Sequence, residues 1–478
     1  MENLQKFYIN GQWAAPISTA TLPVLNPAMN EQIGTVSMGN SHDVDKAVAS
    51  AKAAFASYSQ TSKADRLVLL KQLKEESKKR FEDMAQAMRM EMGAPITMAR
   101  DAQADAALGH LQGFIESLEE LHERIDLPNG DVMLREAIGV CGLITPWNWP
   151  INQIALKVIP ALATGCTCVL KPSEHTPVSA MIYAEIIHSA GYPAGVFNLV
   201  NGDGPTVGSC LARHQDIQMM SFTGSTRAGK AVTHDAAETV KRVTLELGGK
   251  SPNIIFADAD FDKSVSMAAR AAFTNQGQIC LCGSRLFIQE EIYDKFRDAL
   301  VAKTAKLKVG DPKDDSSNLG AVVSKDHMQK ILAKIELAKT LGGKILIGGK
   351  REILEGELRN GYYVQPTIIE GLSSDCDINQ EEIFGPVVSL IPFKTEEEVV
   401  EMANSTKYGL SASIFTENIS KGHRIAAKID SGVVWINTWL LRDLRIPFGG
   451  MKHSGVGREG GFKSLEFFTE PKNVCVKI

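Results

Sequence analysis

From residue 139 onward, short apolar runs alternate with helical segments, and this rhythm limits the possible folds more than any other feature. The run "GVCGLIT" (139–145) predicts a buried strand, and "INQIALKVIPALATG" (151–165) predicts a helix that Gly165 closes. Further strands follow in the runs at 166–171, 196–201, 217–224 and 243–249. Strands and helices that alternate at this spacing predict an α/β fold with a parallel, doubly wound sheet.

A second alternating region begins near residue 250 and runs to about residue 448. Its apolar runs "SRLFIQ", "VVSLIPF" and "SASIFT" predict strands of a separate α/β domain. Before residue 118 we expect a helical region, in which "DVDKAVASAKAAFASY" (43–58) has apolar residues at helical spacing and Ser41 as a possible cap. A chain of 478 residues has room for two or three domains.

Composition and charge argue against several classes of protein. The formal net charge is -5 and the pI is about 6.1, and no basic stretch indicates a nucleic-acid partner. No apolar run reaches the length of about 18 residues that a membrane helix needs, and the start, "MENLQKFYINGQW", has no apolar signal region. The cysteines are scattered without a CxxC pair, which argues against zinc and against a disulfide framework. We therefore expect a cytoplasmic protein with no metal, membrane or nucleic acid as partner.

Polar and glycine-rich segments follow three of the predicted strands, at 171–174, 202–208 and 223–225. Ligands of open parallel sheets bind outside the carboxyl ends of the strands, so we expect these segments to border a ligand. The glycines of "NGDGPTVG" fit a dinucleotide turn or a plain glycine-rich turn, because their spacing is not GxGxxG. In "FTGSTRAG", the backbone N–H groups and the Ser225 hydroxyl fit a diphosphate site or an ordinary helix cap.

Three further segments hold candidate catalytic groups, and each has a structural alternative. "PWNWP" holds Asn148 between two prolines of fixed φ, which is either a stiff support for a directed amide or a packed turn. Glu246 in "LELGGKS" ends a strand among apolar neighbours, where it is either a base with a raised pKa or the partner of a basic residue. "NQGQICLCGSR" holds Cys280 and Cys282 after a polar approach, and these are either a nucleophile and its neighbour or two packed core residues.

Taken together, these motifs resemble the aldehyde dehydrogenase superfamily over essentially the whole chain. "PWNWP", "KPSE", "FTGS", "LELGGKS", "NQGQIC", "EEIFGPV" and "PFGGMKHSGVGREGG" occur in the family's order and at its spacing. The resemblance implies a Rossmann-like NAD-binding domain (1–118 and 139–247), an α/β catalytic domain (248–448) and a β-strand oligomerisation arm (119–138 and 460–478). The tail "NVCVKI" alternates like a strand, and its open edge fits such an arm. A homodimer or homotetramer that oxidises a small aldehyde with NAD is implied.

The resemblance assigns the chemistry to four residues. Cys280, which follows "GQ" and one variable residue, matches the nucleophile, whereas Cys282 lies outside the motif position and lines or supports the pocket. Thiolate attack gives a tetrahedral oxyanion, which expels hydride more readily than the aldehyde does. The Asn148 side chain and the Cys280 N–H match the donors to this oxyanion, and Glu246 matches the base that hydrolyses the thioester. Lys171 matches a lysine implicated in cofactor ribose binding and in poising the site.

The resemblance also implies a set of cofactor-binding residues. Trp147 and Ser225 line the dinucleotide cleft, and Glu382 and Phe384 match the residues that hold the nicotinamide ribose and ring. Glu174 matches the ligand of the adenosine ribose, and its carboxylate would repel a 2′-phosphate and so favour NAD over NADP. The other members of the set are Lys171, Ser173, Gly208, Phe222, Gly224 and Leu247.

The substrate class is indicated by "WINTWLLRDLR" (435–445), which resembles the same stretch of 2-hydroxymuconic and 2-aminomuconic semialdehyde dehydrogenases. In that subgroup an arginine is expected to hold the substrate carboxylate, and Arg442 is the nearest match. The segment "DAQADAALGHLQGF" (101–114) departs from the subgroup and contains no clear second arginine, so a broad range of aliphatic or aromatic aldehydes is the alternative. The presence of Glu246 argues against acyl transfer to coenzyme A, and the intact catalytic set argues against a non-catalytic structural relative.

Overall fold

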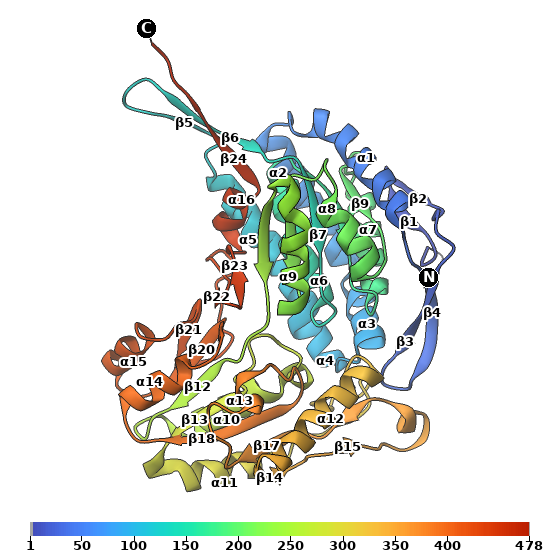
Figure 1. The fold of residues 1–478 in the computed structure, drawn as a ribbon. Helices are drawn as coiled ribbons and strands as arrows, with labels where there is room; N and C mark the ends of the chain where they lie inside the picture. The colour runs from blue at the N-terminus through green and yellow to red at the C-terminus, as the bar shows by residue number, and fades with distance from the viewer. Residues whose placement is uncertain (1–2, 478) are drawn as a thin grey trace.

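The computed structural model describes residues 3–477 and contains two α/β units and a projecting β arm (Figure 1). The first unit is built on an eight-stranded sheet in the order β2 (Gln12–Ala14), β1 (Phe7–Ile9), β9 (Phe197–Leu199), β8 (Thr167–Lys171), β7 (Val140–Ile144), β10 (Met219–Thr223), β11 (Arg242–Glu246) and β23 (Gly455–Val456). The strands from β9 to β11 are parallel. Their order reverses between β7 and β10, and doubly wound sheets bind ligands at such a point. The predicted fold class is confirmed.

Helices pack around this sheet and supply most of the unit's core. They are α1 (Ser41–Tyr58), α2 (Lys63–Lys79), α3 (Phe81–Met92), α4 (Ile96–Met98), α5 (Asp105–Glu120), α6 (Pro150–Ala163), α7 (Pro177–Ser189), α8 (Ser209–Arg213), α9 (Thr226–Ala236) and α16 (Gly461–Phe467). Two π-helical stretches, Ala99–Ala104 and Gly204–Gly208, lead into α5 and α8.

The N-terminal region differs from the prediction in two respects. Asn40, and not Ser41, caps α1: its side chain accepts hydrogen bonds from the N–H groups of His42 and Asp43 at 3.0 and 3.2 Å. Asp43 returns a bond to the Asn40 N–H, and this capping box places Ser41 inside the helix. Strands precede α1 as well, including the hairpin of β3 (Thr21–Asn26) and β4 (Glu31–Ser37), where no element was predicted.

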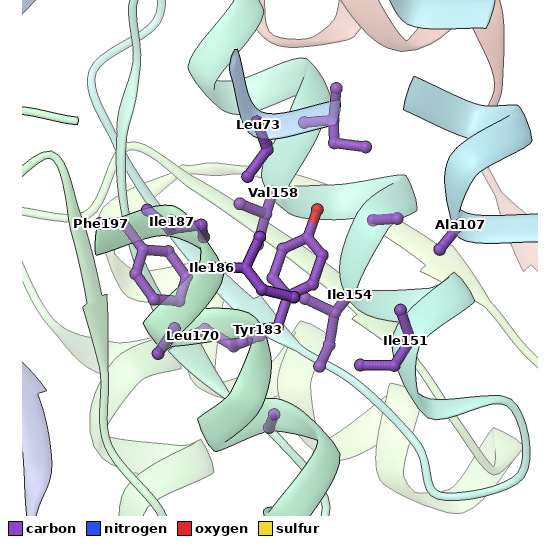
Figure 2. Close-up of a cluster of buried hydrophobic side chains, with 14 of the residues drawn as sticks. Leu73, Ala107, Ile151, Ile154, Val158, Leu170, Tyr183, Ile186, Ile187 and Phe197 are labelled. Carbon is purple, nitrogen blue, oxygen red and sulfur yellow. The ribbon is translucent and has the colours of Figure 1, made fainter. Parts of the chain in front are cut away.

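The main core of the first unit joins α6 and α7 to the sheet (Figure 2). Tyr183 of α7 lies in one buried cluster with Ile154 and Val158 of α6. Pro150 begins α6, where the fixed proline φ suits a first helical residue. Because α6 is buried along almost its whole length, the segment just before it is held firmly at the carboxyl edge of the sheet.

The second unit is a smaller α/β layer. Its sheet has the order β14 (Lys344–Ile347), β17 (Thr367–Glu370), β18 (Val387–Phe393), β13 (Arg285–Gln289), β12 (Pro252–Ile255), β20 (Ser411–Phe415) and β21 (Val433–Ile436). All neighbours from β17 to β21 are parallel, and β14 is an antiparallel edge. The helices are α10 (Phe261–Phe273), α11 (Tyr293–Thr304), α12 (Lys325–Thr340), α13 (Asp377–Gln380), α14 (Glu396–Asn404) and α15 (Ile419–Ala426).

The arm is a three-stranded antiparallel sheet that projects from the body of the molecule (Figure 1). It contains β5 (Arg124–Asp126), β6 (Val132–Ala137) and β24 (Thr469–Val474). The strand β24 therefore includes only the first two residues of "NVCVKI", and Ile478 lies outside the described residues. The helix α16, also within 460–478, packs against α5 in the body.

Within residues 3–477, the helices do not have the length and apolar character of a membrane span. The same residues contain no group of three or more potential metal ligands.

Candidate active site

The loop that carries Cys280 has an unusual backbone. Asn275, Gln276 and Gly277 are consecutive residues with φ of 54°, 56° and 69°, a left-handed conformation that is costly for residues other than glycine. A Cβ atom on Gly277 would lie 2.1 Å from the Gly385 carbonyl oxygen, so glycine is required there. The tertiary contacts of the loop hold it in this shape and so determine where the Cys280 sulfur lies.

Asn148 is bound directly to this loop. Its side-chain Nδ2 donates to the Gln278 backbone carbonyl at 3.0 Å, and the backbone carbonyl of Asn148 accepts from Asn275 Nδ2 at 3.0 Å. The side chain is buried. Because an amide nitrogen has two N–H donors, the bond to Gln278 leaves a second donor beside the segment that leads to Cys280. These bonds tie the turn to the loop of Cys280, and they fit both a directed amide and a packed turn.

Glu246 ends β11 with both carboxyl oxygens buried and without a hydrogen-bond partner in the described part of the chain. A Cβ atom on Gly449 would lie 2.6 Å from Glu246 Oε1, so that glycine leaves room for the carboxyl group. Burial raises the pKa of Glu246 well above its ordinary value, and the Glu459 carboxylate raises it further. This rise is the one predicted from its apolar neighbours. A buried carboxyl without a cation in hydrogen-bond contact is available to a water molecule or a substrate.

A buried ion pair lies behind Glu246, and the sequence prediction missed it. Lys157 of α6 is fully buried and forms an ion pair with Glu459, and its Nζ also donates to the Ser221 hydroxyl at 3.1 Å. Lys157 stood out as a charge in the most apolar segment of the chain, which was the available signal. Buried charges occur almost only when they are paired. The two charges have opposite effects on the pKa of Glu246, because Glu459 raises it and Lys157 lowers it.

Cys280 is half-buried against an apolar wall. The wall contains Trp149, Trp439, Phe448 and the fully buried Cys282. Burial raises the pKa of the Cys280 thiol, and the carboxylates of Glu382 and Glu246 raise it further, whereas the Arg442 charge lowers it. The resting thiol is therefore protonated at neutral pH and needs a base before it can attack.

The two arginines of "RDLR" lie in different environments. Arg445 is exposed and pairs with Asp443 at 2.7 Å and with Glu116 at 3.4 Å. The Arg442 guanidinium carbon lies 4.2 Å from the centre of the Phe448 ring, and its Nη2 is buried without a partner in the described chain. Arg445 therefore belongs to a solvated, ion-paired surface, whereas the Arg442 guanidinium turns inward.

The predicted cofactor residues gather at the carboxyl ends of the parallel strands. Lys171 is buried at the end of β8, where its Nζ donates to the Pro172 carbonyl at 2.9 Å and lies 3.4 Å from Glu174 Oε2. Burial lowers the pKa of Lys171, and Glu174 offsets part of the shift. Gly208 lies beside the Lys171 side chain, and Ser173 is buried between Lys171 and Glu174.

Further predicted cofactor residues lie around the ends of β10 and β11. Ser225 caps α9 by accepting a bond from the Ala228 N–H at 3.3 Å, as the cap alternative predicted. The Phe222 ring covers Gly224, and Leu247 lies against Gly229.

Residues from the second unit lie against this edge of the first unit. The rings of Trp147 and Phe384 meet edge to face, 5.4 Å between centres. His327 contacts both rings and lies 2.7 Å, through Nε2, from the Phe384 carbonyl oxygen. Glu382 Oε1 accepts the Gly249 N–H at 3.0 Å, and burial raises the pKa of Glu382 to about 7. Side chains of both units therefore meet here, with Trp147 against Phe384 and with Glu382 close enough to Cys280 to raise the pKa of its thiol.

The sequence matches one known protein family over almost its whole length. The model of the aldehyde dehydrogenase family matches residues 13–474. The chain belongs to the aldehyde dehydrogenase family. It is thus an oxidoreductase that acts on aldehydes with NAD, as the motifs predicted.

Relatives and solved structures of this family are similar to this chain over nearly its full length. The 2-aminomuconic semialdehyde dehydrogenase of Danio rerio is 42% identical, with 98% of this chain and 97% of that protein covered. The 2-hydroxymuconic semialdehyde dehydrogenase of Pseudomonas sp. (strain CF600) is 40% identical, with 99% of each covered. The crystal structure of a mutant of aldehyde dehydrogenase C from Pseudomonas syringae, in complex with NAD+ and octanal, has a TM-score of 0.96 and 42% identity, with 99% and 97% covered.

Proposed function

We propose that the chain oxidises a carboxylate-bearing semialdehyde to the acid, with Cys280 as nucleophile, Asn148 as oxyanion donor and Glu246 as general base. The unpartnered, buried Nη2 of Arg442 beside the catalytic thiol is the observation that favours this substrate class. The names of two relatives, which describe muconic semialdehydes as their substrates, point the same way. A broad aliphatic range is the competing function, because the wall around Cys280 is apolar and the related enzyme of known structure was crystallised with octanal.

The proposed reaction begins when the Cys280 thiol loses its proton to Glu246 and its sulfur bonds to the aldehyde carbon. The carbonyl oxygen becomes an oxyanion, which the second Asn148 N–H and the Cys280 backbone N–H stabilise. One donor of this kind is worth about 2.7–4 kcal/mol in the transition state. When bound, NAD supplies the acceptor for the two electrons and the proton that leave the aldehyde carbon. Glu246 passes the thiol proton to solvent and then takes a proton from water, whose oxygen attacks the thioester carbonyl carbon. The C–S bond breaks, and the sulfur takes the proton back from Glu246, which releases the acid and the thiol.

The cleft fits a dinucleotide by the chemistry of the residues that line it. The Thr223 hydroxyl, at the carboxyl end of β10, is buried without a partner in the described chain, and the N-terminus of α9 follows it. Hydroxyl and backbone N–H groups at such a position bind phosphate. The carboxylates of Glu174 and Glu382 would accept ribose hydroxyls, and Lys171 holds Glu174 in place from behind.

Replacing Glu174 with glutamine should narrow the preference for NAD over NADP. The carboxylate repels a 2′-phosphate and accepts the ribose hydroxyl, and the amide keeps the shape while it loses the charge. We expect the ratio of kcat/KM for NAD to that for NADP to fall about tenfold, the typical worth of a hydrogen bond to a charged group. Native enzyme that uses both cofactors equally well would contradict the assignment.

Replacing Arg442 with alanine should discriminate between two substrates of equal length, a semialdehyde acid and its methyl ester. A guanidinium–carboxylate bond contributes about 1.5–3 kcal/mol, so kcat/KM for the acid should fall about ten- to a hundredfold more than for the ester. Arg445→Ala is the matched control, since that guanidinium already pairs with Asp443 and Glu116. Equal losses on acid and ester would assign Arg442 a structural role and favour the broad-range alternative.

We also propose that the arm joins copies of this chain into a homodimer or homotetramer. The strand β24 is an edge of the arm sheet and is exposed over most of its length, so its free backbone groups are available to another strand. The division into a NAD-binding domain, a catalytic domain and this arm is part of the same proposal. A cytoplasmic location is supported by the eight free thiols, which suit a reducing compartment.

A further inference from the structure

His110 of α5 is a buried side chain that the reaction above does not use. It is 1% exposed, and both ring nitrogens are buried without a hydrogen-bond partner in the described chain. Buried polar atoms in native proteins almost always have partners, and an unsatisfied one costs about 1–3 kcal/mol. The Asn152 side chain lies close enough to the ring for one weak hydrogen bond, so at least one ring nitrogen remains free for a ligand that is absent from the polypeptide itself.

The packing of α5 brings this imidazole to the Arg442 loop. Gly109 and Gly113 lie one turn apart on α5, and a Cβ atom on Gly109 would be 2.8 Å from Leu444 Cδ1. A Cβ atom on Gly113 would be 3.5 Å from Arg445 Cγ, so the loop rests directly on these two glycines. The ion pair between Arg445 and Glu116 fastens the loop to the same helix.

The environment of His110 sets its charge. Burial and the nearby positive charge of Arg442 lower the pKa of His110 to about 3, so the ring is neutral at physiological pH and has one N–H donor and one acceptor. The Asn152 side chain of α6 can satisfy one ring nitrogen and leaves the other for a ligand. A neutral imidazole next to an unpaired guanidinium gives the pair one net positive charge, which a single carboxylate neutralises.

We propose that His110 is a second ligand of the substrate carboxylate and donates its imidazole N–H to one carboxylate oxygen while Arg442 binds the other. The inference rests on the proposed function and deepens it, because it assigns the distal carboxylate to His110 and Arg442. The sequence has no clear second arginine to bind the substrate carboxylate, and His110 fills that role. It would therefore determine specificity without taking part in the chemical steps.

The test compares His110→Leu and His110→Gln on the semialdehyde acid and its methyl ester. Loss of the imidazole donor should lower the acid-to-ester ratio of kcat/KM about tenfold in His110→Leu, mainly through KM, and glutamine, which has an N–H donor, should restore part of it. The effect should shrink in an Arg442→Ala background, because both side chains bind one group. Gln112→Leu is the control on the same helix, since Gln112 bonds Lys74 and Glu116 instead.

The outcomes separate this inference from the substrate proposal. An unchanged acid-to-ester ratio in both His110 variants, with a lowered ratio in Arg442→Ala, would overturn the role of His110 alone. An unchanged ratio in Arg442→Ala as well would overturn the carboxylate substrate and His110 with it. Equal losses on acid and ester in His110→Leu, with a lower melting temperature and no recovery in His110→Gln, would show that the ring is structural.

Discussion

Cys280→Ala should lose aldehyde oxidation by at least about 10⁴-fold, whereas Cys282→Ala should keep most of the activity. Removal of a covalent nucleophile costs this much or more, because no other group takes over the bond-forming step. Cys280 lies half-buried at the end of the cleft, next to the loop held by Asn148, while Cys282 is packed into the apolar wall. The rate of NADH formation measures both variants.

Two observations make the cysteine comparison decisive. At alkaline pH, where the Cys280 thiolate forms, iodoacetamide should modify Cys280 in the native enzyme, and peptide mass spectrometry should separate this site from the exposed Cys475. NAD binding, followed by protein fluorescence, should survive in both variants and show that each is folded. Comparable loss of activity in two folded variants would contradict the choice between the two thiols.

Glu246→Gln should slow thioester hydrolysis by about 10²–10⁴-fold, the usual contribution of a general base. The amide cannot accept the proton from water, so an acyl-enzyme should accumulate when NAD and aldehyde are added. Intact-mass spectrometry should detect the added acyl group on Cys280. Unchanged turnover without any adduct would refute the assignment.

The pH dependence of kcat in the native enzyme tests the role of Glu246 as general base independently. Hydrolysis needs the carboxylate form, so kcat should fall as pH is lowered through the pKa of Glu246. Burial and the charge of Glu459 raise this pKa above the ordinary value of a glutamate, so the loss should begin at a higher pH than for an exposed glutamate. In Glu246→Gln this limb of the profile should be absent.

Much of the catalytic set could be predicted because each residue stands in a local pattern with a physical meaning. Glu246 ends an apolar strand, and Lys171 ends another, so both were expected at the carboxyl edge of a parallel sheet. Asn148 stands between prolines before a buried helix. In each case the backbone geometry within a few residues already limits where the side chain can lie.

Other features could not be predicted, because they depend on segments that are far apart in the chain. Lys157 and Glu459 are 302 positions apart, and neither segment contains a sign of the other. The cap of α1 was misplaced by one residue because Asn40 and Ser41 are both good caps, and the bonds with Asp43 decided between them.

The loop of residues 442–445 shows most directly what the sequence determines and what the tertiary structure determines. The resemblance of "WINTWLLRDLR" pointed to Arg442 as a candidate substrate ligand, and the motif order identified the family and predicted Cys280 as nucleophile and Glu246 as base. Only the packing of the loop onto Gly109 and Gly113 decided that Arg445 is paired, that Arg442 Nη2 is not, and that the Arg442 charge acts on His110. The physical reason is that a periodic pattern reports which side of an element faces the core, whereas the partner of a charge is set by whichever distant element the packing brings within hydrogen-bond distance.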